Sequence, residues 1–108
     1  KGLIRKLAEA IVVKANGNYE YLDERKAVYE MEDSEFKIDN FIIHVTGVIG
    51  YWITYSTGLY DEPSETNNIF SHVTIDKVFY NVISSKEDDQ KFDSDLINEL
   101  EKLIEKRA

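Results

Sequence analysis

Residues 41–60 read FIIHVTGVIGYWITYSTGLY and contain no Asp, Glu, Lys or Arg, although 31% of the whole chain is charged. From Phe41 to Leu59 the apolar residues fall mainly at odd positions, and their phase never changes. A period of two is typical of a β-strand with one buried face. A two-residue hairpin would move the apolar set to even positions. We therefore expect one strand over 41–56, bent at its glycines; a three-residue turn at Gly47–Ile49 would also keep the phase.

The same stretch is long enough to cross a membrane, which takes about 20 apolar residues. It also contains His44, three glycines, three tyrosines and several hydroxyl side chains, which are costly in lipid. We therefore expect no membrane segment. The chain has no cysteine and no recognisable signal peptide, which fits a reducing, cytoplasmic compartment and excludes disulfides, thiolate metal sites and cysteine nucleophiles.

Helical patterns occupy both ends of the chain. The first has an apolar stripe at helical spacing and a stop at Asn16-Gly17. The second follows Asp93, a good N-cap, and Phe92 before it can pack on Ile97. The stripes are Leu3, Ile4, Leu7, Ala8, Ile11 and Ala15 in the first helix, and Leu96, Ile97, Leu100, Leu103 and Ile104 in the second.

Further strands flank residues 41–56. Residues 27–38 alternate but change phase over 32–35, which predicts a bulge or turn, and Asp39-Asn40 is a plausible two-residue hairpin. Residues 69–84 form another strand with a break at Asp76-Lys77. We expect a loop over 61–68 and a polar connector over 86–91, and residues 18–26 give no clear pattern.

These elements predict one α+β domain over residues 1–108. An antiparallel sheet of three to four strands would carry the N-terminal and C-terminal helices on one face, as a two-layer sandwich. A chain of this length buries a sizeable core without disulfides or metal.

The net charge is −8 and is unevenly spread. Residues 1–15 carry +3, whereas residues 16–40 and 61–90 each carry −5. A negative surface repels nucleic acid and anionic lipid. We therefore expect no direct nucleic-acid or membrane partner, and favour a protein partner that is basic or itself binds nucleic acid.

Motifs for known chemistry are absent from the sequence. It has no nucleophile elbow, phosphate-binding glycine loop, dinucleotide fingerprint or HExxH. If the two long strands pair about position 63, His72 lies opposite residue 54, roughly 33 Å from His44, which is too far for a shared metal. The acids from Glu87 to Asp95 lack the glycine of an EF-hand loop. We expect no enzyme activity, cofactor or metal.

The even positions of residues 41–60 present Trp52, His44 and Tyr60 on the sheet face away from the helices. That face is too apolar for a wet surface and too polar for a core, which indicates partner binding or homodimerisation, unless another segment covers it. We hypothesise a non-enzymatic interaction protein, in one version an inhibitor that mimics nucleic acid. The alternative is a ligand-binding or enzymatic domain with its site at a homodimer interface.

Such small, acidic, cysteine-free chains are common among accessory proteins of bacteria and their phages, although many unrelated folds share this composition. The acids that would steer a basic partner, or stand in for phosphates, form three clusters. They are Glu30, Glu32, Asp33 and Glu35; Asp61, Glu62 and Glu65; and Glu87, Asp88 and Asp89, with Asp93 and Asp95 nearby.

Overall fold

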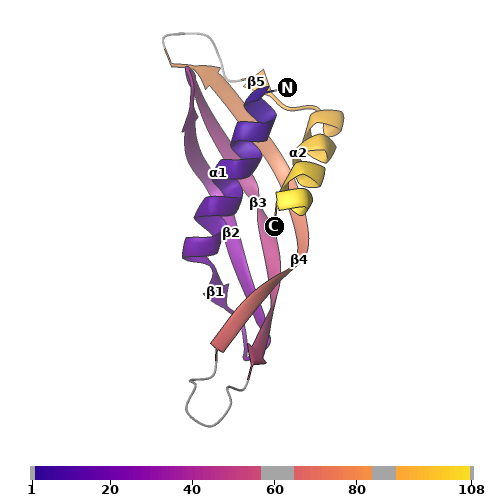
Figure 1. The fold of residues 1–108 in the computed structure, drawn as a ribbon. Coiled ribbons are helices and arrows are strands. Elements are labelled where there is room, and N and C mark those ends of the chain that lie inside the picture. Colours follow the sequence, from indigo (N-terminus) through magenta and orange to yellow (C-terminus); the bar gives the residue numbers. More distant parts are fainter. Residues whose placement is uncertain (1, 57–64, 84–89, 108) are drawn as a thin grey trace.

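A computed structural model describes residues 2–56, 65–83 and 90–107 of the chain. Helix, sheet and helix follow one another along the sequence (Figure 1). The elements are α1 (Gly2–Asn18), β1 (Glu20–Tyr21), β2 (Lys26–Ile38), β3 (Phe41–Ser56), β4 (Glu65–Val82), β5 (Gln90–Lys91) and α2 (Ser94–Arg107).

The sheet is antiparallel throughout, with the strand order β1-β2-β3-β4-β5. The α+β prediction is confirmed, but the expected three to four strands are wrong, since the sheet has five. The extra strands are β1 and β5, which have two residues each and lie in the unassigned segment and the expected connector. Two residues are too few for an alternating pattern, so the sequence could not predict them.

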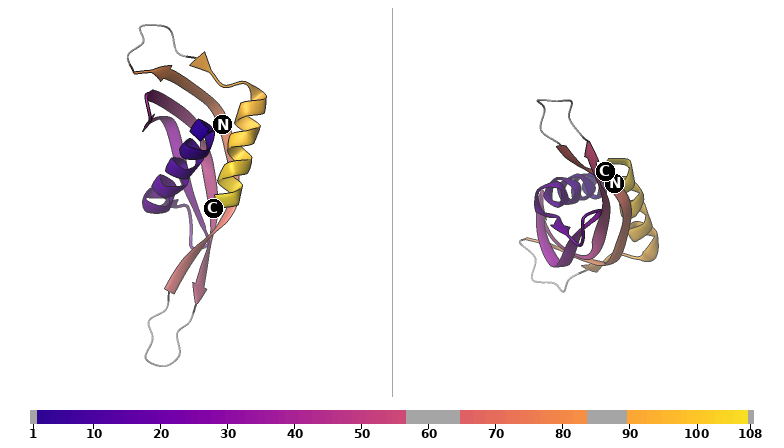
Figure 2. Two further views of the ribbon diagram at one scale, coloured as in Figure 1. Left: turned by 45° about the horizontal axis from the view of Figure 1, so that its top comes forward. Right: turned by 90° about the horizontal axis from the view of Figure 1, so that it is seen from below.

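Both helices lie against the same face of the sheet, and the paired ends of β3 and β4 extend past them (Figures 1 and 2). The odd-numbered residues of β3 point into the core between sheet and helices. Ile43, Val45 and Ile49 are fully buried there, together with Leu7 and Ile11 of α1. From α2, Leu100 and Ile104 are fully buried in the same core.

Helix α1 ends at Asn18, beyond the predicted stop at Asn16-Gly17. Gly17 does not have a positive φ, so it is not the left-handed cap that the sequence suggested. The side-chain amide of Asn18 instead donates a hydrogen bond of 2.8 Å to the carbonyl of Lys14. That bond satisfies one of the carbonyls that the helix end leaves without a partner.

Strands β2 and β3 form the predicted hairpin. Ile38 pairs with Phe41 across Asp39-Asn40, and Asp39 has φ 53°. The predicted phase change in β2 is a bulge between Met31 and Ser34, where Asp33 has φ 51°. The continuous strand expected over 41–56 is confirmed as β3.

Strand β4 begins at Glu65, so residues 65–68 are strand and not the loop that the sequence predicted. The irregularity at Asp76-Lys77 is confirmed, because Ile75 pairs with Gly47 and Lys77 with Thr46. A second irregularity at Ser71 was not predicted. The irregularity moves His72 by one position, from opposite Ile49 to opposite Gly50. The expected position opposite residue 54 is wrong mainly because Ser56 pairs with Glu65, which centres the hairpin between residues 60 and 61 and not at 63.

Helix α2 begins as predicted, with the Asp93 carboxylate accepting a 2.9 Å hydrogen bond from the backbone N–H of Leu96. Phe92 is buried beside it, in edge contact with Tyr80. Within the described ranges, no helix is both long and apolar enough to cross a membrane.

Candidate functional site

The face of the sheet away from the helices carries the even-numbered residues of β3 and the residues paired with them. Trp52 lies opposite Lys26 of β2 and Ile69 of β4, and Gly50 lies opposite Val28 and His72. Trp52 is 47% exposed and Ile69 is 52% exposed. Neither helix covers this face (Figure 2). Two large apolar side chains are therefore left in solvent side by side on neighbouring strands.

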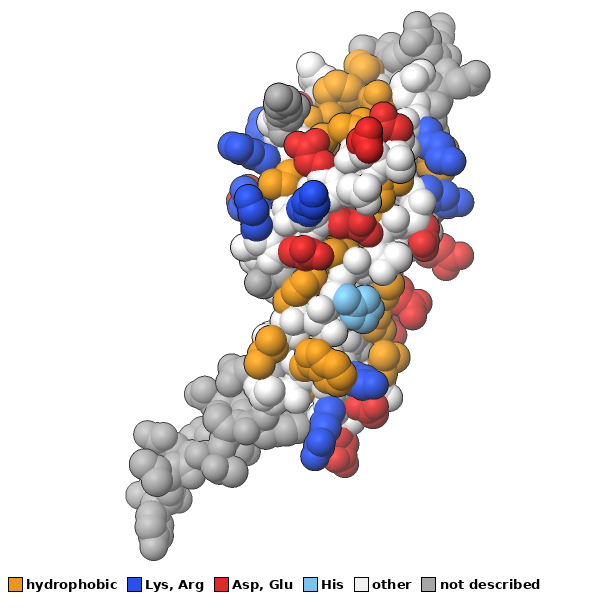
Figure 3. All heavy atoms as spheres, turned by 90° about the vertical axis from the view of Figure 1, so that its right-hand side faces the viewer, with side chains coloured by type: hydrophobic (Ala, Val, Ile, Leu, Met, Phe, Trp, Pro, Cys, Tyr) orange, Lys and Arg blue, Asp and Glu red, His pale blue; other side chains and the backbone are white. Residues whose placement is uncertain are grey.

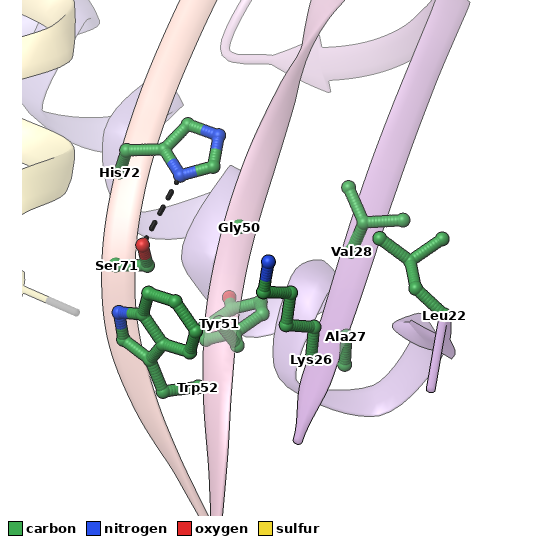
Figure 4. A pocket seen from close by; sticks show the side chains of 9 residues that line it. All are labelled: Leu22, Lys26, Ala27, Val28, Gly50, Tyr51, Trp52, Ser71 and His72. Carbon is green, nitrogen blue, oxygen red and sulfur yellow. Dashed lines mark hydrogen bonds between the residues drawn. The ribbon is translucent and has the colours of Figure 1, made fainter. Parts of the chain in front are cut away.

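All of these residues except Ile69 border a hollow of about 310 Å³ (Figure 4). His72 and Trp52 stand on one side, and Val28 and Leu22 on the other, with the side chain of Lys26 between them. The full lining is Leu22, Lys26, Ala27, Val28, Gly50, Tyr51, Trp52, Ser71 and His72.

Gly50 lies at the floor of the hollow, and the ring of His72 occupies the space that a side chain at position 50 would fill. A Cβ on Gly50 would collide with the imidazole. The Nδ1 of His72 also lies 3.2 Å from the Ser71 hydroxyl oxygen, a contact that helps to orient the ring. The position of His72 thus depends on the missing side chain of Gly50 and on the irregular register at Ser71.

The segment before β2 holds Lys26 and Leu22 in place. The Asp23 carboxylate accepts hydrogen bonds from the backbone N–H groups of Arg25 (2.7 Å) and Lys26 (2.9 Å), as in an Asx turn. The N–H of Leu22 donates to the carbonyl of Lys26 at 2.8 Å. The Lys26 ammonium then lies 5.2 Å from the centroid of the Trp52 ring, a cation–π distance.

Trp52 also borders a second, more open hollow of about 570 Å³. Its lining is Asp23, Glu24, Arg25, Lys26 and Trp52. The indole is therefore accessible from two sides.

Sequence reasoning placed Trp52 on this face but missed Leu22, Lys26, Val28 and Ile69. Alternation within β3 was enough for Trp52. The others come from β1–β2 and β4, and only the cross-strand register brings them to the same place. The charge-free run at residues 67–75, NNIFSHVTI, is the one sequence signal that could have drawn attention to Ile69 and His72.

His44 lies elsewhere on the same face. It pairs with Phe79, six residues along β3 from Gly50, which is about 20 Å at the rise of a strand. The expected separation of roughly 33 Å from His72 is therefore too long, but the two rings still cannot share a metal. His44 Nδ1 lies 3.6 Å from a carboxylate oxygen of Asp33 instead. Among the described residues no three His, Asp or Glu side chains gather as metal ligands.

The acids of β2 do not join the hollow. Glu30 pairs with Val48 and Glu35 with His44, which puts them about 13 and 26 Å along β3 from Trp52. Glu32 and Asp33 lie between them, at the bulge. All four are exposed and form a row along one strand.

Most of the remaining candidate residues lie outside the part of the chain that the structure describes. Tyr60, Asp61, Glu62, Glu87, Asp88 and Asp89 lie outside the described residues, and Glu65 is placed only as the first residue of β4. The structure thus brings Trp52 together with residues that were not candidates, and separates it from His44 and the acids of β2.

Comparisons of the chain with protein-family models, curated proteins and solved structures found no match.

Proposed function

We propose that this protein is a non-enzymatic interaction module that binds another protein through the hollow beside Trp52. The observation that carries the proposal is the exposure of Trp52 and Ile69, side by side on the sheet face that the helices leave open. Binding energy at protein interfaces concentrates in a few aromatic and apolar anchors of this kind.

The dimensions and lining of the hollow favour a side chain over a free metabolite. Small-molecule sites occupy about 300–1,000 Å³ and enclose most of the ligand. This hollow is at the lower end of that range and open to solvent. One apolar side chain of a partner would lie between Trp52, His72 and Leu22, beside the side chain of Lys26 and with Ser71 at the polar rim.

The charges suit a steering role. The row from Glu30 to Glu35 gives one strand a strongly negative edge, which would speed encounter with a basic or nucleic-acid-binding partner. The side of the molecule shown in Figure 3 carries acidic and basic side chains interspersed. This mixture of charges supports the hypothesis that the acidic row steers a partner more than the hypothesis that the whole surface mimics nucleic acid.

Affinity capture tests the proposal when one substitution is compared with a matched control. We expect wild-type protein and Val13→Ala to recover the same partner, because Val13 is exposed on α1, away from the hollow. Trp52→Ala should weaken binding by about 30-fold or more, because truncating a tryptophan anchor costs about 2 kcal/mol or more. Equal affinity of the three proteins would contradict the proposal.

Two further measurements on that complex identify the kind of contact. Trp52 is the only tryptophan, so its emission should shift to shorter wavelength as the partner excludes water from the ring. Affinity that falls 100-fold or more between about 50 and 200 mM salt would favour nucleic-acid mimicry, because contacts of many charges respond steeply to salt. If the affinity falls by only a few-fold, the acids steer the partner but do not mimic nucleic acid.

A further inference from the structure

The two long edges of the sheet, on β2 and on β4, differ in how they are protected against pairing with a strand of another chain. On β2, the described neighbour β1 pairs only with Ala27 and Val28, so the rest of that edge has no strand beside it. It carries Glu30, Glu32, Asp33 and Glu35 and is interrupted by the bulge at Asp33. Charges and bulges are the usual means by which proteins keep an open edge from pairing with another chain.

The edge of β4 is occupied only along its second half. Strand β5 pairs with Phe79 and Tyr80, and the N–H of Phe92 donates to the carbonyl of Val78 at 2.9 Å. The N–H of Ile75 donates to the Glu101 carboxylate of α2, also at 2.9 Å. From Ile75 to Tyr80, this edge is therefore covered by side chain or backbone.

Before Ile75 the same edge is open. No described strand lies beside residues 68–74 on the side away from β3. Their sequence, NIFSHVT, has no charged residue if His72 is neutral, and Ile69 is half exposed. This part of the β4 edge is thus uncharged and partly apolar over seven residues. The β2 edge, by contrast, carries charges and a bulge.

We propose that a second copy of this chain pairs with residues 68–74 of β4 as an antiparallel strand, across a twofold axis. The charge distribution is compatible with self-association at this edge and disfavours it at the β2 edge. Two copies with a net charge of −8 repel each other unless their contact surface is free of charge. A twofold axis sets each segment against itself, so no acid opposes another acid within residues 68–74. The same operation on β2 would set Glu30 to Glu35 against their own copies.

This inference does not rest on the proposed function. Pairing at the β4 edge extends the sheet in its own plane, so the hollow beside Trp52 stays open on each copy. Trp52→Ala should therefore leave the dimer intact while it removes partner binding. Failure of one proposal does not imply failure of the other.

The test is the molar mass in solution, measured by sedimentation equilibrium over protein concentrations from about 1 to 200 μM. One chain has a mass of 12.5 kDa, and we expect the wild type to approach twice that value. Thr74→Lys should shift the midpoint of dimerisation at least tenfold higher, because it places a charge at each end of the paired segment, opposite Asn68 of the other copy, on an edge that is otherwise uncharged. Thr54→Lys, the same change on the inner strand β3, should leave it unchanged. Circular dichroism establishes that both variants fold.

Hydrogen exchange locates the contact. Amides of residues 68–74 that point away from β3 should gain protection as concentration rises, while amides on the β2 edge should not. A monomer at every concentration would overturn the proposal. So would a dimer that tolerates Thr74→Lys, one protected elsewhere, or a β4 edge that pairs only with a strand of a different protein.

Discussion

At the scale of single residues, two glycines of β3 allow a close approach for different reasons. A Cβ on Gly47 would lie 2.5 Å from the backbone oxygen of Thr74 and 2.9 Å from the Cα of Ile75. For a Cβ on Gly50, the three nearest atoms all belong to the imidazole of His72. Backbone cannot yield without disturbing the β3–β4 register, whereas an exposed side chain can rotate away.

We therefore expect Gly47→Ala to lower the free energy of unfolding by about 2–3 kcal/mol, and Gly50→Ala by about 1 kcal/mol or less. Part of each cost is offset because alanine has less freedom than glycine in the unfolded chain. Urea unfolding at neutral pH measures both changes. Equal losses would mean that His72 is held as firmly as the backbone.

Tyr51 has a buried hydroxyl with no hydrogen-bond partner. Burial raises its pKa above the ordinary value of 10.0, and the neighbouring phenols of Tyr19 and Tyr29 raise that pKa further. Burial also raises the pKa of Tyr29, but a hydrogen bond with Ser34 opposes that shift. Two tyrosines of one core thus differ in whether the hydroxyl is satisfied.

Tyr51→Phe should stabilise the protein by about 1 kcal/mol, because it removes a polar group that is buried without a partner. Tyr29→Phe is the matched control and should destabilise it by a similar amount, since it breaks a hydrogen bond. A stability loss in both variants would contradict the assignment of the Tyr51 hydroxyl as unsatisfied.

The same residue predicts a dependence on pH. A folded-state pKa above the unfolded value of about 10 means that the neutral phenol is favoured by folding. That contribution is fully present below pH 10 and is lost as the pH rises above it. The urea midpoint of the wild type should fall between pH 9.5 and 11.5, and Tyr51→Phe should fall less. Parallel curves for the two proteins would assign the alkaline loss to other groups.

At the scale of elements, the sequence predicted the long regular elements and two of the three irregularities in strand pairing. Strand β3 and helix α2 follow from long, regular patterns, and both have the expected extent. The bulge at Asp33 was predictable because apolar residues change phase around it. The irregularity at Ser71 was not, since Ile69, Phe70, His72 and Val73 show no clean change of phase. That one extra residue moved His72 to the hollow.

The start of α2 is an element-scale feature with a single cause. Asp93 accepts the N–H of Leu96, and substituting such an N-cap by alanine costs about 1 kcal/mol. Asp93→Ala should lose that amount in urea unfolding. Asp93→Asn keeps an acceptor oxygen and should retain most of the stability. Equal losses would assign the effect to the negative charge near the helix terminus rather than to the hydrogen bond.

At the scale of the molecule, one sheet separates a face that the helices cover from a face that they leave open. The helix-covered face was predictable as a set, because its residues share the phase of β3 and the stripes of the two helices. On the open face only the even positions of β3, such as Trp52 and His44, were predictable. The rest of the hollow combines residues from β2, β4 and the turn before β2, and no periodicity within one segment encodes that combination.

The net charge of the whole molecule also affects its stability. The described ion pairs Lys6–Asp39 (3.0 Å) and Arg107–Glu9 (3.9 Å) are both exposed, and such pairs stabilise a protein by only about 0–1 kcal/mol. Self-repulsion of a −8 chain acts on the compact state throughout. Salt should therefore stabilise this protein, because screening removes more repulsion than attraction.

We expect the melting temperature to rise by about 2–5 °C between about 10 and 200 mM NaCl, as a gain of about 0.5–1 kcal/mol would produce in a chain of this size. Differential scanning calorimetry at one low protein concentration measures the shift. A variant with Glu87→Gln, Asp88→Asn and Asp89→Asn carries three fewer negative charges and should show a smaller rise. A fall with salt would mean that attractive pairs outweigh the net charge. An unchanged rise in the variant would place the repulsion in the other acidic clusters, above all the row on β2.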